Sequence, residues 1–320
     1  MFIPYPMKLK PTLKSALWGG TQLAESWHKA APGESVAEAW ELTVREKEQN
    51  LIVNGVYATK TLNEVLAEHG EMVGAQHTGE RFPLLIKFID AEQTLSVQVH
   101  PDDGYAARVE HDSGKNEMWY IVDAASGAEI VYGLREGVSA EDFRLAVAED
   151  RIRDVLNFHP VRAGECYYIP AGLVHAIGAG ILIAEIQQNS DLTYRVYDYD
   201  RRGPDGKLRE LHKEKACDVV CPMSEEDILA KRYAAGPAEV DILAHPIYFQ
   251  VRKCRCTVGD IVQGTVGRDS FVHLLCLAGE AEIETADCRV VMTRGDSVFL
   301  PAGMGDYRID GEAEWLSTKL

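Results

Sequence analysis

Short stretches in which apolar and polar residues alternate, separated by turns rich in Gly, Pro, Asp and Asn, occupy most of the 320-residue chain. Successive side chains of a β-strand point to opposite faces, so this period of two predicts half-buried strands. In residues 94–100 the apolar positions alternate with a polar set, namely Ser96, Gln98 and His100. The pattern as a whole predicts an all-β fold, a barrel or a sandwich, with helical additions.

Three stretches have a helical pattern instead. Two of them begin with a capping-box signature ahead of an apolar run, Thr61 with Glu64 and Ser139 with Asp142. The second extends over about residues 139–156, and a third, over about 207–231, lies between two strand-rich regions. We therefore expect helices as additions to the β-structure and a helical linker between its two halves.

An internal repeat supports two such halves. The segment GECYYIPAGLVH, residues 164–175, matches GDSVFLPAGMGD, residues 295–306, in the order glycine, acid, aromatic, aliphatic, Pro, Ala and Gly. Agreement over a whole segment of this length indicates a duplicated β-unit rather than a common turn. We expect an N-terminal unit within residues 1–205, with a helical insertion at about 139–156, a helical linker at 206–235 and a second unit at 236–320.

The formal net charge of −17 restricts the possible partners. A negatively charged surface repels nucleic acid and anionic membrane, so we expect neither as a partner. An anionic small substrate would need a local group of Lys and Arg. No apolar run approaches the ~20 residues of a membrane helix, the first twenty residues contain no secretory core, and the seven Cys are scattered. We expect a cytoplasmic protein with reduced thiols.

Candidate metal ligands stand at the ends of predicted strands. Gln98 and His100 share the polar face of one strand, Glu117 lies on the next strand, and His175 follows the turn of residues 170–172. Two imidazoles, a carboxylate and an amide oxygen form a set that suits Zn²⁺ with one position open for water or substrate. Iron, manganese and nickel also suit such a set. The lack of Cys ligands indicates a catalytic rather than a structural metal.

The spacing Gly-x5-Pro-x-Gly-x2-His, which ends at His175, resembles the second motif of the cupin superfamily. Glu117 stands where the first cupin motif has its carboxylate. We therefore expect a double cupin fold, that is, two jelly-roll β-barrels. In the second copy of the repeat Asp306 replaces His175, and residues 269–273 supply no full ligand set. The second barrel is accordingly predicted to be structural, without a metal of its own.

Several further segments resemble one enzyme family over nearly the whole chain. They are LWGG at 17–20, AEAWEL at 37–42, QVHPDD at 98–103, KNEMWY at 115–120, EIQQNSDLTYRVYDYDR at 185–201 and GKLRELHKEKA at 206–216. Together with a Gln in place of the first cupin His, they are similar to the mannose-6-phosphate isomerases of bacterial type. The resemblance implies an aldose-ketose isomerase that interconverts mannose 6-phosphate and fructose 6-phosphate through an enediol, with one zinc ion per chain.

The resemblance also implies roles for individual residues. The residues that correspond to the zinc ligands are Gln98, His100, Glu117 and His175. Arg195 corresponds to the active-site arginine, which would stabilise negative charge on the enediolate, and Glu185 corresponds to a candidate proton-transfer base. Ser96, Lys115 and Arg201 correspond to groups near the phosphate or the sugar of the substrate. Of these, Lys115 and Arg201 would hold the phosphate by charge-assisted hydrogen bonds.

Two other interpretations stay open at this stage. One is a metal-cupin oxygenase, which would use a redox metal such as Fe²⁺, although Gln98 and the basic residues oppose it. The other is a sugar-binding or regulatory protein with two cupin barrels and no catalysis. The chain also departs from the larger eukaryotic relatives, because Ile177 stands where they have an aromatic residue and because their separate helical domain is lacking.

Overall fold

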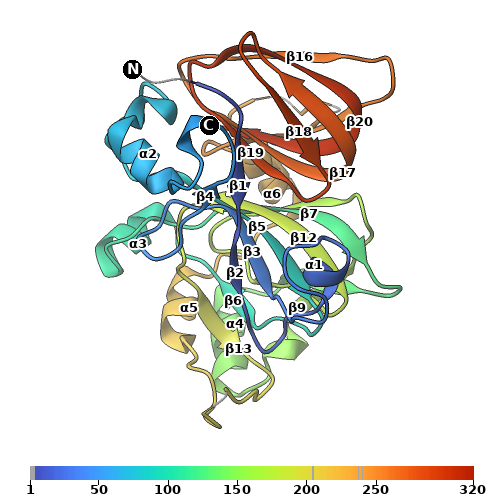
Figure 1. The fold of residues 1–320 in the computed structure, drawn as a ribbon. Coiled ribbons are helices and arrows are strands. Elements are labelled where there is room, and N and C mark those ends of the chain that lie inside the picture. Colours follow the sequence, from blue (N-terminus) through green and yellow to red (C-terminus); the bar gives the residue numbers. More distant parts are fainter. Residues whose placement is uncertain (1–3, 204, 237, 240) are drawn as a thin grey trace.

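The computed structural model describes residues 4–203, 205–236, 238–239 and 241–320, and these form mainly β-structure (Figure 1). Two antiparallel sheets make the N-terminal barrel. The six-stranded sheet has the order β10 (Cys166–Ile169), β7 (Glu117–Ala124), β12 (Ile181–Gln188), β5 (Leu84–Ala91), β3 (Glu38–Leu42) and β2 (Thr12–Lys14). The five-stranded sheet has the order β13 (Tyr194–Tyr197), β6 (Val97–Val99), β11 (His175–Ala176), β8 (Glu129–Leu134) and β9 (Leu156–Pro160).

A third, nine-stranded sheet forms the C-terminal barrel (Figure 1). Its main path is β14 (Ile242–Ala244), β15 (Gln250–Cys256), β20 (Gly305–Lys319), β17 (Val272–Glu284), β19 (Ser297–Leu300), β1 (Met7–Lys10) and β4 (Leu51–Ile52). Two further strands extend it, since β16 (Val262–Val266) pairs with β20 and β18 (Arg289–Thr293) pairs with β17. The first strand of the chain therefore lies beside strands near its end, with Met7 opposite Phe299.

The middle of the six-stranded sheet is buried on both faces. All eight residues of β12 and all eight of β5 are buried. Their apolar side chains share a cluster with Phe271 and Phe299 of the C-terminal barrel. Strands covered on both faces have near-continuous apolar runs, such as LLIKFIDA in β5, instead of strict alternation. A Lys within such a run, Lys87, has to find its partners inside the protein.

The helices lie outside the sheets. They are α1 (Gln22–Glu25), α2 (Leu62–Glu68), α3 (Asp103–Val109), α4 (Ala140–Ala148), α5 (Lys213–Val219) and α6 (Glu225–Arg232), with single 3₁₀ turns η1 (Gly55–Tyr57), η2 (Gly70–Met72) and η3 (Ile152–Asp154). Both predicted capping boxes are present, Thr61 with Glu64 at α2 and Ser139 with Asp142 at α4. Within the described residues, no helix is long and apolar enough to cross a membrane.

Two helices are shorter than the sequence pattern predicted. The helix that begins after Ser139 ends at Ala148, because Asp150 adopts the left-handed conformation, with φ of 54°. The residues that follow form η3 and the edge strand β9. The stretch 207–231 contains two short helices instead of one, and Pro222 lies in the segment between them. A proline lacks the amide hydrogen that a continuous helix would need at that point.

The internal repeat has the same local structure in both copies. A short strand, β10 or β19, leads into a tight turn whose glycine, Gly172 or Gly303, has a positive φ of 89° or 77°. This left-handed conformation is costly for residues with a Cβ, which explains the shared Pro-Ala-Gly sequence. The turns close with equivalent hydrogen bonds of 3.1 Å, Leu173 to Pro170 and Met304 to Pro301. The two copies of the repeat therefore share a strand and a turn of the same conformation, as a duplicated unit would, and the duplication of the whole unit stays a prediction.

Candidate metal centre

Two imidazoles and a carboxylate converge inside the N-terminal barrel. His175 begins β11 and His100 follows β6 in the five-stranded sheet, whereas Glu117 begins β7 in the facing six-stranded sheet. The Nε2 atoms of the two imidazoles lie 3.1 Å apart. Glu117 Oε1 lies 3.3 Å from the Nε2 of His100 and 3.2 Å from that of His175. All three residues are buried.

Backbone carbonyls set the orientation of both imidazole rings. The Nδ1 of His100 lies 2.7 Å from the carbonyl oxygen of Leu192, and the Nδ1 of His175 lies 2.8 Å from that of Leu173. A carbonyl only accepts hydrogen bonds, so each Nδ1 carries the proton and donates it. Burial, followed by the nearby Lys115 ammonium, lowers the pKa of His100 to about 3. Its ring is therefore neutral, with the Nε2 lone pair directed at the other two residues.

The three groups are spaced like ligands of one metal ion. A tetrahedral zinc ion with bonds of about 2.0–2.1 Å places its ligand atoms about 3.3–3.4 Å apart. The observed separations of 3.1, 3.2 and 3.3 Å are close to that value. Both carboxylate oxygens of Glu117 are buried without a hydrogen bond to the described residues, although Lys115 Nζ lies 2.9 Å from Oε2. A cation between these groups would satisfy them, so the donor set fits a metal.

Cross-strand neighbours extend the site along the inner face of the five-stranded sheet. Gln98 of β6 pairs with His175 of β11 on one side and with Arg195 of β13 on the other. Residues paired in this way share a face of the sheet. The Gln98 amide nitrogen lies 3.3 Å from His175 Nε2. Arg195 is half-buried, and its Nε is buried without a hydrogen-bond partner among the described residues.

A second row of side chains lies across the facing sheet. Its successive members in β3, β5, β12 and β7 are Trp40, Lys87, Glu185 and Trp119. The Trp119 indole donates to Glu185 Oε2 at 3.0 Å. Lys87 Nζ lies 3.3 Å from Glu185 Oε1 and 3.5 Å from Glu38 Oε2. Burial, followed by the charge of Glu117, raises the pKa of Glu185, which is a property of proton-transfer groups.

Of this row only Glu185 was predicted from the sequence as a site residue, whereas Trp40, Lys87 and Trp119 were not. The signal for Lys87 was its place as the one charged residue among the first six of β5, where all neighbours are apolar. Burial opposes its ammonium charge, yet Glu38 and Glu185 raise the pKa of Lys87 above its ordinary value. No sequence pattern indicated that the Trp119 indole would bond to Glu185, because the two residues lie 66 positions apart.

The predicted substrate-binding residues lie in two places. Lys115 Nζ is 2.9 Å from Glu117 Oε2 and 3.3 Å from His100 Nε2, so it lies against the metal ligands. Ser96 is also buried, and it lies on the polar face of the strand that carries Gln98 and His100, at the end away from His100. Arg201 lies outside the strands, where it donates to the carbonyl of Thr94 at 2.7 Å. These positions separate a metal end from an arginine end of the site.

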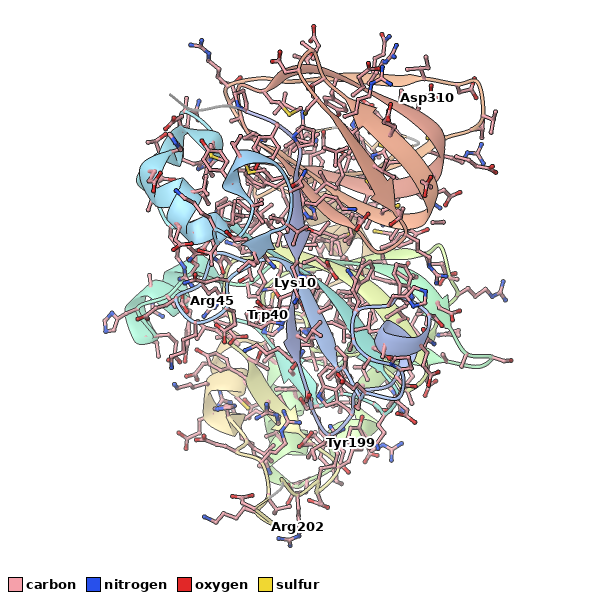
Figure 2. The ribbon with its side chains drawn as sticks, in the orientation of Figure 1. Lys10, Trp40, Arg45, Tyr199, Arg202 and Asp310 are labelled. Atoms are coloured by element: carbon pink, nitrogen blue, oxygen red, sulfur yellow. The ribbon has the colours of Figure 1, made fainter. Side chains whose placement is uncertain are left out.

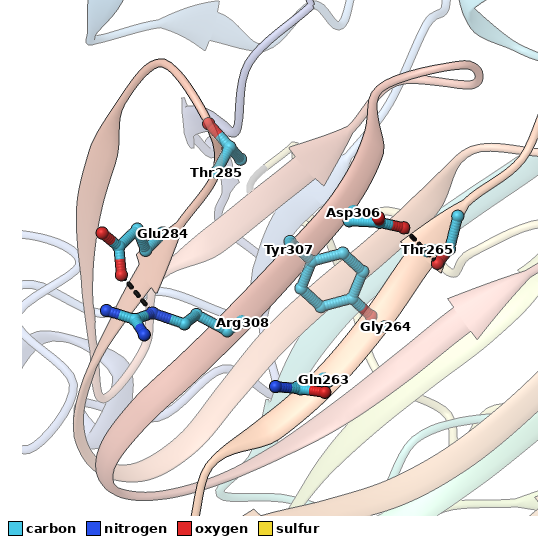
Figure 3. A pocket seen from close by; sticks show the side chains of 8 residues that line it. All are labelled: Gln263, Gly264, Thr265, Glu284, Thr285, Asp306, Tyr307 and Arg308. Atoms are coloured by element: carbon cyan, nitrogen blue, oxygen red, sulfur yellow. Dashed lines mark hydrogen bonds and ion pairs between the residues drawn. The ribbon is translucent and has the colours of Figure 1, made fainter.

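A hollow of about 640 Å³ in the C-terminal barrel has a different character (Figure 3). Its charged side chains pair with neighbours, Arg308 with Glu284 and Asp306 with the hydroxyl of Thr265. Asp306 is the counterpart of His175 in the repeat, and it is exposed. Within the described residues, the one group of three His, Cys, Asp or Glu side chains whose ligand atoms lie within 4.8 Å of one another is that of the N-terminal barrel.

Comparisons with known proteins agree with this geometry. Residues 7–136 match the family model for the phosphomannose isomerase type I catalytic domain. Residues 242–319 match that for the mannose-6-phosphate isomerase cupin domain. The chain is 36% identical over 321 residues to the mannose-6-phosphate isomerase ManA of Bacillus subtilis (strain 168), with 98% of this chain and 99% of that protein covered. It is 35% identical to the mannose-6-phosphate isomerase of Streptococcus mutans, with 98% of each covered.

Solved structures give the same result. The crystal structure of mannose 6-phosphate isomerase from Bacillus subtilis has a TM-score of 0.86 and 33% sequence identity, with 98% of this chain and 99% of that chain covered. A crystal structure of mannose 6-phosphate isomerase bound with zinc and yttrium has a TM-score of 0.77 at 18% identity, with 98% of each chain covered. The expected cupin fold is confirmed, with the sheets of the N-terminal barrel arranged as a sandwich rather than a closed barrel.

Proposed function

Since this chain belongs to the phosphomannose isomerase type I family, we propose that it interconverts mannose 6-phosphate and fructose 6-phosphate with the help of one zinc ion. The observation that carries the proposal is the convergence of His100, Glu117 and His175 on one point inside the barrel. Arg195 and Glu185 lie on the two sheet faces that enclose this point. A group of this composition is suited to an aldose-ketose isomerisation.

In the proposed site, His100, Glu117 and His175 hold the zinc ion. When bound, zinc supplies positive charge that polarises an oxygen of the substrate. Gln98 remains a predicted fourth ligand, because a rotation of its amide would exchange the nitrogen, 3.3 Å from His175 Nε2, for the oxygen. The Lys115 ammonium, next to Glu117, would bind the sugar at this end of the site.

The isomerisation requires a proton to move between C1 and C2 of the sugar. Glu185 is the proposed carrier of this proton, because burial and the charge of Glu117 raise its pKa. A carboxylate with a raised pKa is a stronger base and gives up its proton closer to neutral pH. The Trp119 indole and Lys87 hold the carboxylate oxygens in place from two sides.

Arg195 is the proposed stabiliser of the negative charge that develops on the sugar oxygens. It shares a sheet face with Gln98 and His175, and its Nε has no partner among the described residues. A fixed cation of this kind acts most strongly in the transition state, when the oxygen carries most charge. The position of its guanidinium is secured by the hydrogen bond from Nη1 to the carbonyl of Glu210, at 2.9 Å.

A coupled assay tests the proposal. Purified protein is incubated with mannose 6-phosphate, and the fructose 6-phosphate formed is converted by an auxiliary enzyme that yields a coloured or absorbing product. We expect turnover that a chelator abolishes and that added zinc restores. The absence of turnover in the zinc-loaded protein, or full turnover after exhaustive chelation, would contradict the proposed reaction or its metal dependence.

A further inference from the structure

Three arginines gather around one buried carboxylate at the end of the site away from the metal ligands. Asp198 follows β13, and its side chain is 4% exposed. Arg201 forms an ion pair with its Oδ1, and Arg209 Nη1 lies 3.3 Å from the same oxygen. Arg195 is the third arginine, three residues before Asp198. The side chain of Arg209 is 27% exposed, so the group is in contact with solvent.

Arg209 reaches this place because residues 208–212 run beside β13. The His212 amide donates to the carbonyl of Arg195 at 2.7 Å, and the Arg195 amide donates to His212 Nδ1 at 3.2 Å. Near the other end of the segment, Leu208 forms a β-bridge with Arg202. In Figure 2, Tyr199 and Arg202 mark this region, at the end of the molecule opposite to Asp310.

The turn that carries Asp198 and Arg201 has an unusual conformation. Tyr199 and Asp200 both have positive φ, 56° and 53°. The Arg201 amide donates to the carbonyl of Asp198 at 3.1 Å, which closes a type I′ turn. Such turns normally contain Asn and Gly, because other residues pay a steric cost in this conformation. Backbone strain of this kind persists at places where surrounding contacts enforce it, often at binding sites.

The charges of the group do not balance. Three guanidinium ions face one buried carboxylate, which leaves an excess of positive charge in a protein of net charge −17. The carboxylate of the nearby Glu210 is 83% exposed and lies 4.0 Å from His212, so water screens it. Burial, followed by the charge of Arg209, lowers the pKa of Arg195. An anion between the arginines would relieve this repulsion.

The hydrogen-bond donors of the three arginines are used to different extents. All three nitrogens of Arg201 are engaged, with Nε and Nη2 on Asp198 and Nη1 on the carbonyl of Thr94. Arg209 makes one hydrogen bond within the described chain, from Nη1 to Asp198. The Nε of Arg195 has none. Three of the five N–H groups of Arg201 thus bond to the protein, whereas Arg209 has four N–H groups left for a ligand and Arg195 has its Nε among those left.

The distance to the metal ligands suits a phosphorylated sugar. Arg195 pairs with Gln98 and Tyr197 with Val97, so Asp198 lies near Ser96 on the neighbouring strand. At about 3.3 Å per residue, this end lies about 7 Å along the strand from Gln98. A six-carbon sugar phosphate has its phosphate at one end and its reacting carbons at the other. The strand from Ser96 to His100 provides a matching pair of ends.

We propose that Arg209 binds the phosphate of the sugar phosphate directly, and that Arg201 is a positioning residue that holds Asp198 and the strained turn in place. This inference rests on the proposed function and deepens it. It assigns a substrate contact to the segment between the two barrels, and it changes the role expected for Arg201 from direct contact to support.

The test compares Arg209→Gln with Arg202→Gln in the zinc-loaded protein. Arg202 is a matched control, because it lies in the same region and is exposed, and because its side chain bonds only to the carbonyl of Gly206 among the described residues, while its backbone bridge with Leu208 does not depend on the side chain. For Arg209→Gln we expect the KM for mannose 6-phosphate and the dissociation constant of inorganic phosphate to rise by about 10- to 100-fold, as for loss of a charged hydrogen bond. The kcat should change less than the KM. Arg202→Gln should leave both constants within about twofold.

Calorimetry of inorganic phosphate binding tests the anion site separately from the isomerase assignment, because the measurement requires no turnover. Phosphate binding that depends on Arg209 in a protein without isomerase activity would support the anion site and refute the reaction. If Arg209→Gln keeps isomerase activity, and both its KM and its dissociation constant for phosphate are unchanged, the proposed anion site is overturned while the isomerase assignment stands. If Arg209→Gln fails to fold, Arg209→Lys replaces it; this variant keeps the charge, loses the planar donors and should show a smaller rise in both constants.

Discussion

Replacement of Lys87 by Met tests whether the row of charges in the six-stranded sheet is as tightly coupled as its geometry indicates. The Lys87 ammonium lies 3.5 Å from Glu38 Oε2 and 3.3 Å from Glu185 Oε1, and its side chain is 6% exposed. Met keeps the length and the apolar stem but removes the charge, which leaves two carboxylates without their cation. Loss of one partner from a buried ion pair costs about 3–5 kcal/mol of unfolding free energy. That is a large share of the ~5–15 kcal/mol that stabilises a typical protein.

The loss should depend on pH with a definite sign. Without Lys87, the folded-state pKa of Glu185, already raised by burial and by Glu117, rises further above its unfolded value. A carboxyl with a raised folded-state pKa binds its proton more readily in the folded protein, so stability falls as pH rises through the interval between the two values. The deficit of Lys87→Met should therefore be largest at neutral pH and shrink as pH falls toward 4.5.

Urea unfolding of the wild type and the variant between pH 4.5 and pH 8 measures this effect. Lys14→Met is the matched control, because the Lys14 ammonium also lies over the Trp40 ring, 4.8 Å from its centroid, compared with 5.1 Å for Lys87. Unlike Lys87, Lys14 has a side chain that is 36% exposed, and its ion pair with Glu48 lies near the surface. We expect Lys14→Met to cost less than about 1 kcal/mol. Equal losses for the two variants, or a Lys87→Met deficit that grows on acidification, would refute the reasoning.

Three further predictions concern single residues. His175→Ala should lose bound metal and turnover together, whereas His159→Ala, at a half-buried His of the same sheet, should keep both. Full metal occupancy in His175→Ala, measured by elemental analysis, would exclude His175 as a metal ligand. Arg195→Ala should lower kcat by about 100-fold or more with unchanged metal content, and near-normal kcat would exclude Arg195 from the mechanism. Ser139→Ala should lower the unfolding free energy by about 1 kcal/mol, because it removes the two hydrogen bonds of the Ser139 hydroxyl with Asp142 and leaves only the one from the Ser139 amide to the Asp142 carboxylate; no change in urea unfolding would show that this hydroxyl contributes nothing.

Local patterns predicted much of the chain correctly. The two capping boxes appear in the structure as expected, and the strand predicted within residues 94–100 is present but shorter, as Val97–Val99, because each depends on neighbours a few residues apart. The same pattern did not tell which face of that strand points inward. Ser96 and His100 are buried, and the facing sheet supplies their surroundings. The length of the helix after Ser139 was also wrong, because the left-handed Asp150 that ends it leaves no clear signature.

The sequence by itself determined the types of groups available for chemistry, the duplicated turn of Pro170 to Gly172 and the candidate ligands, since these follow from residue identity and short spacing. Only the tertiary structure decided which groups meet. Lys87 lies between Glu38 and Glu185 because β3, β5 and β12 are adjacent, and Arg209 reaches Asp198 because a later segment folds back beside β13. Contacts of this kind depend on strand order and register, and the free energy that selects them comes from burial over the whole fold, which no local stretch of sequence encodes.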